Sequence, residues 1–216
     1  HLQLHAVNEA GQLKLLNARV VCIGAGGLAS SLLMYLQAAG IGCIGIVDGD
    51  TVSLSNLQRQ VLFDQHQIGQ NKALAAAENL QRKNKDTKII AIPEFLNQEN
   101  AERLIENYDV VIDCCDNLAT RYVINDTCYR LKKPFFFASV NNYEGMLCVF
   151  LPTNAGCFRC LFPEPTQAHE NCNAQGILGV LPGIIGLLQT NEILKHLLSI
   201  GTSQPSHVIH FDTMTS

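Results

Sequence analysis

The sequence predicts an α/β protein with a Rossmann-like, mainly parallel sheet, helices on both faces and an antiparallel second half. As far as residue 133, short apolar runs rich in β-branched residues alternate with helix-length segments. That alternation is typical of repeated βαβ units, whose crossover helices cover a parallel sheet. Later, two strand-like runs are separated only by Asn141-Asn-Tyr-Glu144. A connection this short holds no crossover helix, so it indicates an antiparallel pair.

The elements of the first half follow from composition and from end signals. Residues 70–83 are rich in Ala, Leu, Glu and Lys, which favour a helix. Asp116 and Asn117 precede another helical segment, and either side chain can cap it. The expected strands are 19–23, 43–47, 88–92 and 110–112, and the expected helices are 28–39, 70–83, 99–107 and 118–131.

The second half begins after Pro134 and has a different texture. Strands are expected over 135–140, 145–151 and 207–211, and a helix is expected to start at Pro182, a favoured first-turn residue. Residues 157–176 show little periodicity and are expected to form a long surface loop, a kind of segment that is usually functional or disordered. The whole chain, 1–216, is predicted to be a single domain with halves of about 18–133 and 134–216.

Composition excludes several classes of protein. With 47% hydrophobic residues the chain can bury a core. The 15 basic residues are outnumbered by 19 acidic ones and form no polybasic run, so nucleic acid is not the expected main partner. No apolar stretch reaches the roughly 18 residues of a membrane span. Nine cysteines, several in apolar runs, and no secretory signal peptide argue against a disulfide framework. We therefore expect a soluble cytoplasmic protein.

A glycine turn is the first candidate site. Gly24-Ala-Gly26-Gly27-Leu-Ala29 matches the G-x-G-x-x-G/A pattern between an expected strand and helix. Glycines let the backbone approach a phosphate, and the helix N-terminus supplies N–H donors. A tight turn without a ligand is the alternative. Asp48, at the end of the second strand, favours ribose binding, which NAD and ATP sites share.

The polar stretch from Asp48 to Lys72 distinguishes between these two nucleotides. Asn56, Arg59 and Lys72 can together surround a triphosphate, Arg59 through its planar fork and Lys72 as a compact charge. Either cation alone would more often be a solvated surface charge. Their combination with the glycine turn favours ATP over a nicotinamide nucleotide.

A third motif, Cys114-Cys-Asp116-Asn117, follows the fourth strand. Open α/β sheets bind ligands at this carboxyl edge. Asp116 can hold Mg²⁺ through one carboxylate while nucleotide phosphates supply further ligands. The alternative role for this motif is a helix N-cap, which either Asp116 or Asn117 can form.

Three cysteines outside the apolar runs are candidates for other chemistry. Cys157-Phe-Arg-Cys160 is half of a tetrahedral thiolate zinc site, and two free thiols are the alternative. A second pair of this spacing does not occur in these 216 residues. Cys172 lies in the polar loop and is expected to be more accessible than the core cysteines, although accessibility alone does not lower a thiol pKa.

Taken in order, these motifs resemble the ThiF/MoeB/HesA family, which is related to the adenylation domains of ubiquitin-activating enzymes, and they look closer to the ThiF type than to the MoeB type. The similarity runs almost end to end, and its most specific part is the Ser-Asn-Leu-Gln-Arg-Gln motif with its downstream lysine. The motifs are Gly-Ala-Gly-Gly, Asp48-Gly-Asp50, Ser55-Asn-Leu-Gln58-Arg-Gln60, Ile68-Gly-Gln-Asn-Lys72, Cys115-Asp-Asn117, Cys157-Phe-Arg-Cys160 and Glu170-Asn-Cys172.

The resemblance implies a nucleotidyltransferase. Such an enzyme uses ATP and Mg²⁺ to adenylate the C-terminal glycine of a ubiquitin-like sulfur-carrier protein, ThiS-like or MoaD-like, and releases pyrophosphate. The activated carrier then serves sulfur transfer in thiamine or molybdopterin biosynthesis. A homodimer, and a sulfurtransferase or cysteine desulfurase as a further partner, are also implied. Residues 134–216 would form the carrier-binding and cysteine-loop half.

The resemblance also assigns roles to residues. Gly27 is expected at the phosphates, Asp48 at the ribose and Asp116 at the metal. The expected catalytic residues are Arg59, Lys72, Asp116 and Cys172, the last with an accessory covalent role. The expected nucleotide-binding residues are Gly24, Gly26, Gly27, Asp48, Asp50, Ser55, Asn56, Gln58, Arg59, Lys72, Asp116 and Asn117. The family's N-terminal arginine aligns just before His1 and its second zinc pair after Ser216, so both are expected outside this sequence.

Two other classes stay open at this point. An NAD-dependent oxidoreductase would share the glycine turn and Asp48, but it has no evident need for Asn56, Arg59 and Lys72 together. A non-catalytic carrier-binding subunit would be expected to have lost the arginine, the lysine or Asp116. The sequence retains all three.

Overall fold

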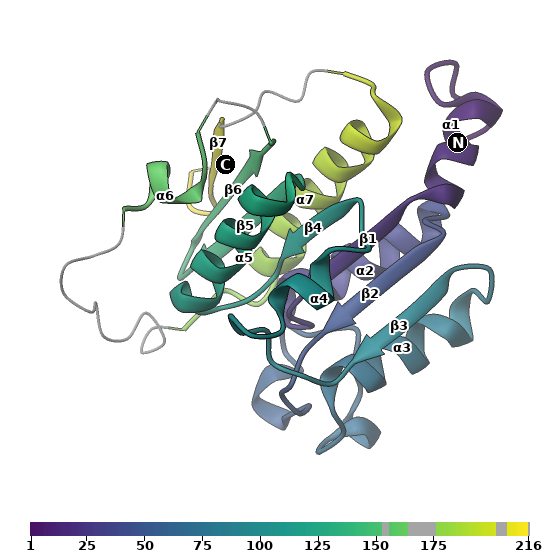
Figure 1. Cartoon of the computed structure of the whole chain (residues 1–216). Coiled ribbons are helices and arrows are strands. Elements are labelled where there is room, and N and C mark those ends of the chain that lie inside the picture. The colour runs from purple at the N-terminus through teal and green to yellow at the C-terminus, as the bar shows by residue number, and fades with distance from the viewer. Residues whose placement is uncertain (153–155, 164–175, 202–206, 216) are drawn as a thin grey trace.

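A computed structural model of the protein describes residues 1–152, 156–163, 176–201 and 207–215. Seven strands form one sheet in the order β3-β2-β1-β4-β5-β6-β7 (Figure 1). The strands are β1 (Arg19–Ile23), β2 (Cys43–Val47), β3 (Lys88–Ile92), β4 (Val110–Asp113), β5 (Phe135–Asn141), β6 (Glu144–Phe150) and β7 (Val208–Asp212). The first five are parallel, and β6 and β7 each pair antiparallel to the strand before them. The predicted fold class is confirmed.

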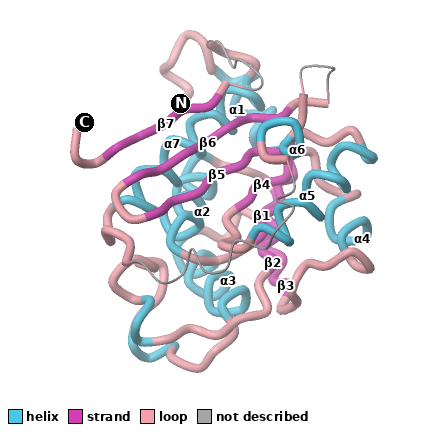
Figure 2. The backbone as a smooth tube through the Cα atoms, turned by 90° about the vertical axis from the view of Figure 1, so that its left-hand side faces the viewer, coloured by secondary structure: helices cyan, strands magenta, loops and turns pink. Residues whose placement is uncertain are grey.

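Helices cover both faces of this sheet (Figure 2). They are α1 (Asn8–Asn17), α2 (Gly27–Ala39), α3 (Lys72–Lys83), α4 (Ala101–Ile105), α5 (Leu118–Leu131), α6 (Phe158–Leu161) and α7 (Leu181–Leu198), with short 3₁₀ turns η1 (Leu54–Asn56) and η2 (Gln65–Gln67). Strand side chains alternate between two apolar clusters. In β1, Val20 and Cys22 join the cluster that contains α2, α3 and α7, whereas Val21 and Ile23 join the one that contains α4, α5 and α6. Period-two alternation thus gives one sheet two cores.

Capping side chains mark where two helices begin. Asn71 accepts a hydrogen bond from the Leu74 amide at 3.1 Å, so α3 starts two residues later than the predicted 70–83. Asn117 accepts one from the Thr120 amide at 2.8 Å. An amide or hydroxyl at the N-cap satisfies N–H groups that have no partner within the helix.

Two helices lie where the sequence predicted none. The helix α1 was not predicted, because it buries only Gly11 and Leu15 and therefore shows no apolar stripe. Residues 157–176 were predicted to be a surface loop, but they begin with α6, whose Phe158 is buried in the second apolar cluster. A single buried aromatic leaves no periodicity to detect, so that prediction was wrong for 158–161.

The ladder between β4 and β5 is short. It pairs only Val111 with Phe135 and Ile112 with Phe136. Beyond that point the side chain of Gln189, from α7, donates from Nε2 to the carbonyls of both Asp113 (3.0 Å) and Phe136 (2.9 Å). A buried amide thus replaces the ladder where these strands part.

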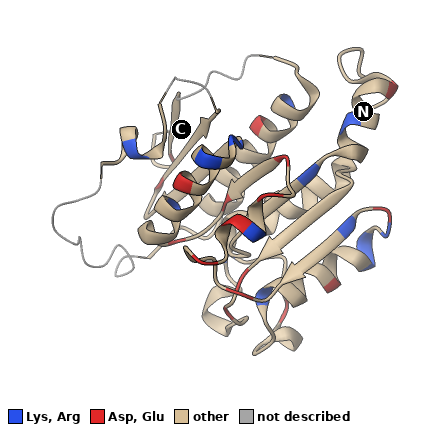
Figure 3. Ribbon diagram, viewed as in Figure 1, with Lys and Arg blue, Asp and Glu red and all other residues tan. Residues whose placement is uncertain are grey.

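Charges and hydropathy add two further observations. In the view of Figure 3, Lys and Arg positions are interspersed with Asp and Glu positions and do not gather on one element. Within the part of the chain that the structure describes, no helix has both the length and the apolar character needed to cross a membrane.

Candidate active site

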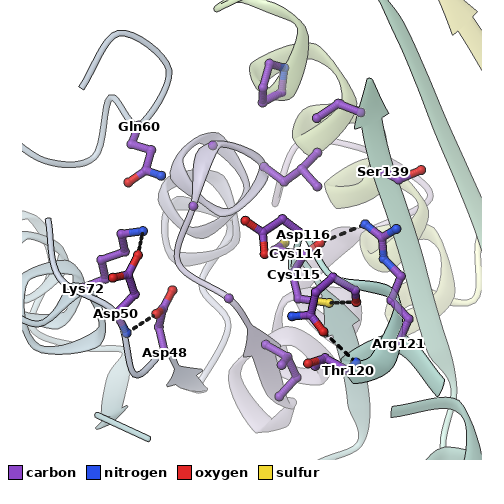
Figure 4. A pocket seen from close by; sticks show the side chains of 18 of the residues that line it. Asp48, Asp50, Gln60, Lys72, Cys114, Cys115, Asp116, Thr120, Arg121 and Ser139 are labelled. Atoms are coloured by element: carbon purple, nitrogen blue, oxygen red, sulfur yellow. Dashed lines mark hydrogen bonds and ion pairs between the residues drawn. The ribbon is translucent and has the colours of Figure 1, made fainter. Parts of the chain in front are cut away.

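A cavity of about 760 Å³ opens at the carboxyl ends of β1, β2 and β4 (Figure 4). The chain runs from β1 to β2 on one side and places β4 on the other, and ligands of open α/β sheets bind at such a switch point. Its volume is within the range of small-molecule sites. The lining comes from the glycine turn, residues 48 and 50, 59–60, Lys72, 94–96, 114–117, Thr120 and Arg121, 139–141, 176–177 and Pro182.

The glycine turn is fixed by close backbone contact. Gly24 has φ +94°, and a Cβ on it would lie 2.6 Å from the carbonyl oxygen of Cys114. Only glycine fits there, so the turn lies directly against the loop that follows β4. In the part of the chain that the structure describes, no side chain caps α2, which begins after Gly26. Its first N–H groups are therefore available to an anion.

Asp48 ties the glycine turn to the second strand. Its Oδ2 accepts from the Ala25 amide at 2.7 Å, and its Oδ1 accepts from the Asp50 amide at 2.8 Å. Asp48 lies in the cavity, as expected of a ribose ligand, but it also has this structural role.

Lys72 meets the neighbouring carboxylate. Its Nζ lies 2.6 Å from Oδ2 of Asp50, and the lysine side chain is only 8% exposed. Burial alone would raise the pKa of Asp50, but hydrogen bonds from Lys72 and the Thr51 amide, together with the charge of Lys72, outweigh burial and lower it. The cavity thus holds a buried cation with an exposed partner.

Arg59 lines the cavity, and its side chain is held by Asn56. Its Nη2 donates to Oδ1 of Asn56 at 2.8 Å, and Nδ2 of Asn56 donates to Oγ of Ser53 at 2.6 Å. Asn56 is not part of the cavity lining and orients Arg59 instead. The exposed residues Ser55 and Gln58 also lie outside the lining. The predicted ligand roles of all three stay predictions.

Asp116 is exposed on the cavity wall, on the loop between β4 and α5. Within the described residues, no hydrogen bond or ion pair holds its carboxylate. Asn117, which also lines the cavity, is the residue that caps α5, leaving Asp116 available to a ligand. No group of three or more His, Cys, Asp and Glu that could hold a metal occurs in the described ranges. The single carboxylate of Asp116 fits a hard cation that takes most of its ligands from phosphates and water.

Several lining residues escaped sequence reasoning. Gln60 is 4% exposed and its Oε1 has no hydrogen-bond partner among the described residues, although the residue belongs to a recognised motif. Phe95 is 68% exposed and packs across Gly49, where a Cβ would lie 2.5 Å from the ring. Arg121 is a lone helical arginine, which in a sequence is indistinguishable from a solvated one.

The cysteines separate into two kinds. Burial raises the pKa of the Cys114 and Cys115 thiols well above the usual range, so neither is an activated nucleophile. The sulfurs of Cys157 and Cys160 lie 3.7 Å apart, away from the cavity. Two sulfurs on a tetrahedral zinc would be about 3.8 Å apart, so the pair fits half of such a site. Cys172, with Glu170 and Asn171, lies outside the described residues.

Comparisons with known proteins agree with this geometry. The family model described as "ThiF family" matches residues 1–216. The chain is 41% identical to "Adenylyltransferase and sulfurtransferase MOCS3" of Mus musculus over 213 residues, covering 98% of this chain and 46% of the relative. It is 42% identical to "Sulfur carrier protein adenylyltransferase" of Thermus thermophilus over 218 residues, covering 98% of this chain and 80% of the relative. The chain thus spans about half the length of the MOCS3 relatives.

Solved structures show the same fold at lower identity. MccB of E. coli, in a crystal structure with AMPCPP and MccA, superposes with a TM-score of 0.81 at 22% identity, covering 94% of this chain and 66% of that one. PaaA superposes with a TM-score of 0.79 at 20% identity, covering 94% and 63%.

Proposed function

Because the chain belongs to the ThiF family, we propose that it uses ATP to adenylate the C-terminal glycine of a ubiquitin-like sulfur-carrier protein, releasing pyrophosphate. The observation that carries the proposal is the meeting of Arg59, Lys72, the glycine turn and Asp116 in one cavity. The names of the relatives, an adenylyltransferase and sulfurtransferase and a sulfur-carrier adenylyltransferase, support the reaction and the substrate class.

The chemistry needs positioned charge and no general base. The carrier carboxylate is already ionised near neutral pH. It attacks the α-phosphorus, a carboxyl oxygen–phosphorus bond forms, the α–β phosphoanhydride bond breaks and pyrophosphate leaves with its electron pair. Arg59 and Lys72, which both line the cavity, would stabilise the negative charge that develops on phosphate oxygens. Asp116 would hold Mg²⁺, which would neutralise further phosphate charge.

The two halves of the chain would bind different substrates. The first half supplies the glycine turn, Asp48, Arg59, Lys72 and Asp116, which suit a nucleotide. The same cavity extends past Ser139 and Asn141 of β5, and we assign that end to the carrier's glycine tail. Its lining there comes from the second half of the chain, as a carrier-binding half requires.

The remaining assignments rest on the family resemblance and, for zinc and the location, also on the cysteines of the sequence. They are a homodimer, a sulfurtransferase or cysteine desulfurase as partner, a cytoplasmic location, a ThiF-type preference with a thiamine or molybdopterin pathway, zinc at Cys157 and Cys160, and an accessory covalent role for Cys172.

ATP–pyrophosphate exchange tests the proposal directly. We expect exchange with a ThiS-like or MoaD-like carrier that ends in Gly-Gly, and none when the terminal glycine is deleted. Arg59→Ala and Asp116→Ala should each lower the exchange rate about 100-fold or more. Arg82→Ala, which removes an exposed arginine paired with Glu78, is the matched control and should leave the rate unchanged.

Two outcomes would contradict the proposal. One is no exchange by the folded protein with several such carriers. The other is a nicotinamide-dependent absorbance change without exchange, which would favour the oxidoreductase.

A further inference from the structure

The peptide group of Cys115, the residue before Asp116, is held by two charged side chains. Its N–H donates to Oδ1 of Asp113 at 2.9 Å. Its carbonyl accepts from Nη2 of Arg121 at 2.9 Å. The same Arg121 lies on Asp113, with 3.3 Å between Nε and Oδ2. These contacts close a ring of two side chains around one backbone residue, which we call the Cys115 clamp; Figure 4 shows Arg121 beside Asp116.

The clamp is buried and supported from both faces of the sheet. Asp113 is fully buried and the Arg121 side chain is 15% exposed. The guanidinium carbon of Arg121 lies 5.2 Å from the centre of the Phe137 ring, a cation–π distance. On the opposite face, Gln189 donates to the Asp113 carbonyl. Neither charged side chain can turn away without losing a buried contact.

Arg121 and Asp113 make hydrogen bonds of better geometry to Cys115 than to each other. Oδ2 of Asp113 and Nε of Arg121 are buried and form an ion pair at 3.3 Å, and within the described residues neither atom makes a hydrogen bond of good geometry. A buried ion pair is weak evidence for a purely stabilising role, because an apolar pair often stabilises a core at least as well. The bonds with good geometry are instead the two to Cys115.

We propose that Arg121 and Asp113 are positioning residues that set the Asp116 carboxylate relative to the glycine turn. The inference rests on the proposed function, since it assumes that Asp116 binds the cation that accompanies ATP. Gly24 supports it independently, because its close contact with the Cys114 carbonyl makes the glycine turn and the clamped loop one unit. A shift of Cys115 would therefore move Asp116 away from phosphates held at the turn.

Calorimetric titration of ATP in excess Mg²⁺ and in excess EDTA tests this role without measuring turnover. Arg121→Lys keeps a positive charge beside Asp113 but loses the planar fork that also reaches the Cys115 carbonyl. We expect the gain in ATP affinity that Mg²⁺ gives to fall about tenfold, as for other groups that orient metal ligands. Affinity in EDTA should stay within about twofold, because Arg59 and Lys72 are untouched.

The control is Arg130→Lys, on the same helix, where Arg130 pairs with Glu102 at 3.0 Å on the surface. It should leave both titrations unchanged. If Arg121→Lys had a lower melting temperature but a wild-type Mg²⁺ effect, the clamp would be only a stabilising contact. That result would overturn this inference and leave the proposed function standing. Absence of Mg²⁺-dependent ATP binding in the wild type would remove the proposed function and the clamp together.

Discussion

Lys72 and Asp50 form a 2.6 Å ion pair in which the lysine is buried and the aspartate is half exposed. Lys72 is the first residue of α3, and Asp50 follows β2 on the neighbouring loop. Asn71 connects these segments by donating from Nδ2 to the Asp48 carbonyl at 2.9 Å. The cation that faces the cavity is therefore already placed, and it carries its own counter-ion.

Asp50→Asn should lower the melting temperature of the free protein, because Lys72 then lies buried without a carboxylate. ATP should restore more stability to this variant than to the wild type, since a phosphate supplies the missing anion. Thermal unfolding with and without ATP measures both effects. Lys72→Met is the contrasting variant and should show less stabilisation by ATP than the wild type. If ATP stabilised Asp50→Asn less than it stabilises the wild type, the result would instead indicate that Asp50 itself contacts the nucleotide.

Gly24→Ala should destabilise the fold and weaken ATP binding. The new Cβ meets the Cys114 carbonyl, and φ +94° is strained for alanine. A cost of about 1–3 kcal/mol from strain alone is expected, with the collision in addition. Gly69→Ala is a matched control, because Gly69 has φ +86° with nothing within 4 Å of a Cβ. Equal losses of unfolding free energy in the two variants would show that the backbone contact contributes nothing.

Phe158→Ala should cost about 3–5 kcal/mol of unfolding free energy, since the ring is buried against Phe137 and Tyr122. Chemical denaturation measures this value. Leu161→Ala, at the end of the same short helix and 39% exposed, should cost less than about 1 kcal/mol. A small loss for Phe158→Ala would mean that α6 is not anchored to the core.

Stability should decline as the pH falls below about 6.5 because of His196. Burial lowers the pKa of this histidine below its usual 6.5, so the unfolded chain takes up a proton first. The contribution is complete above the unfolded pKa and is lost as the pH falls toward the folded pKa. His196→Phe keeps the edge contact with Phe136 and should flatten this part of the pH profile. Exposed His66→Gln should retain the decline, and an unchanged slope in His196→Phe would assign it to another group.

Sequence reasoning predicted the elements whose cause is local. Buried parallel strands such as residues 19–23 and 43–47 appear as continuous apolar runs, and the short connection after Asn141 required an antiparallel pair. Asp48, Arg59, Lys72 and Asp116 were found through their motifs, and all four line one cavity. Their roles as ligands stay predictions.

What sequence reasoning could not find depends on contacts between distant segments. Gln189 and Asp113 are 76 positions apart, and the sequence around each residue contains no pattern that predicts their contact. The burial of Phe158 depends on strands that precede it by about 20 residues. Arg121 belongs to a helix of mixed polarity, and only the fold shows that it faces inward.

The parting of β4 and β5 has an evolutionary consequence. Gln189, a fully buried side chain that does not line the cavity, holds the two strand ends through the two N–H groups of one amide. Its replacement by an apolar residue would leave both strand carbonyls without this donor in a buried site, so we expect this position to be retained while the exposed lining residues diverge.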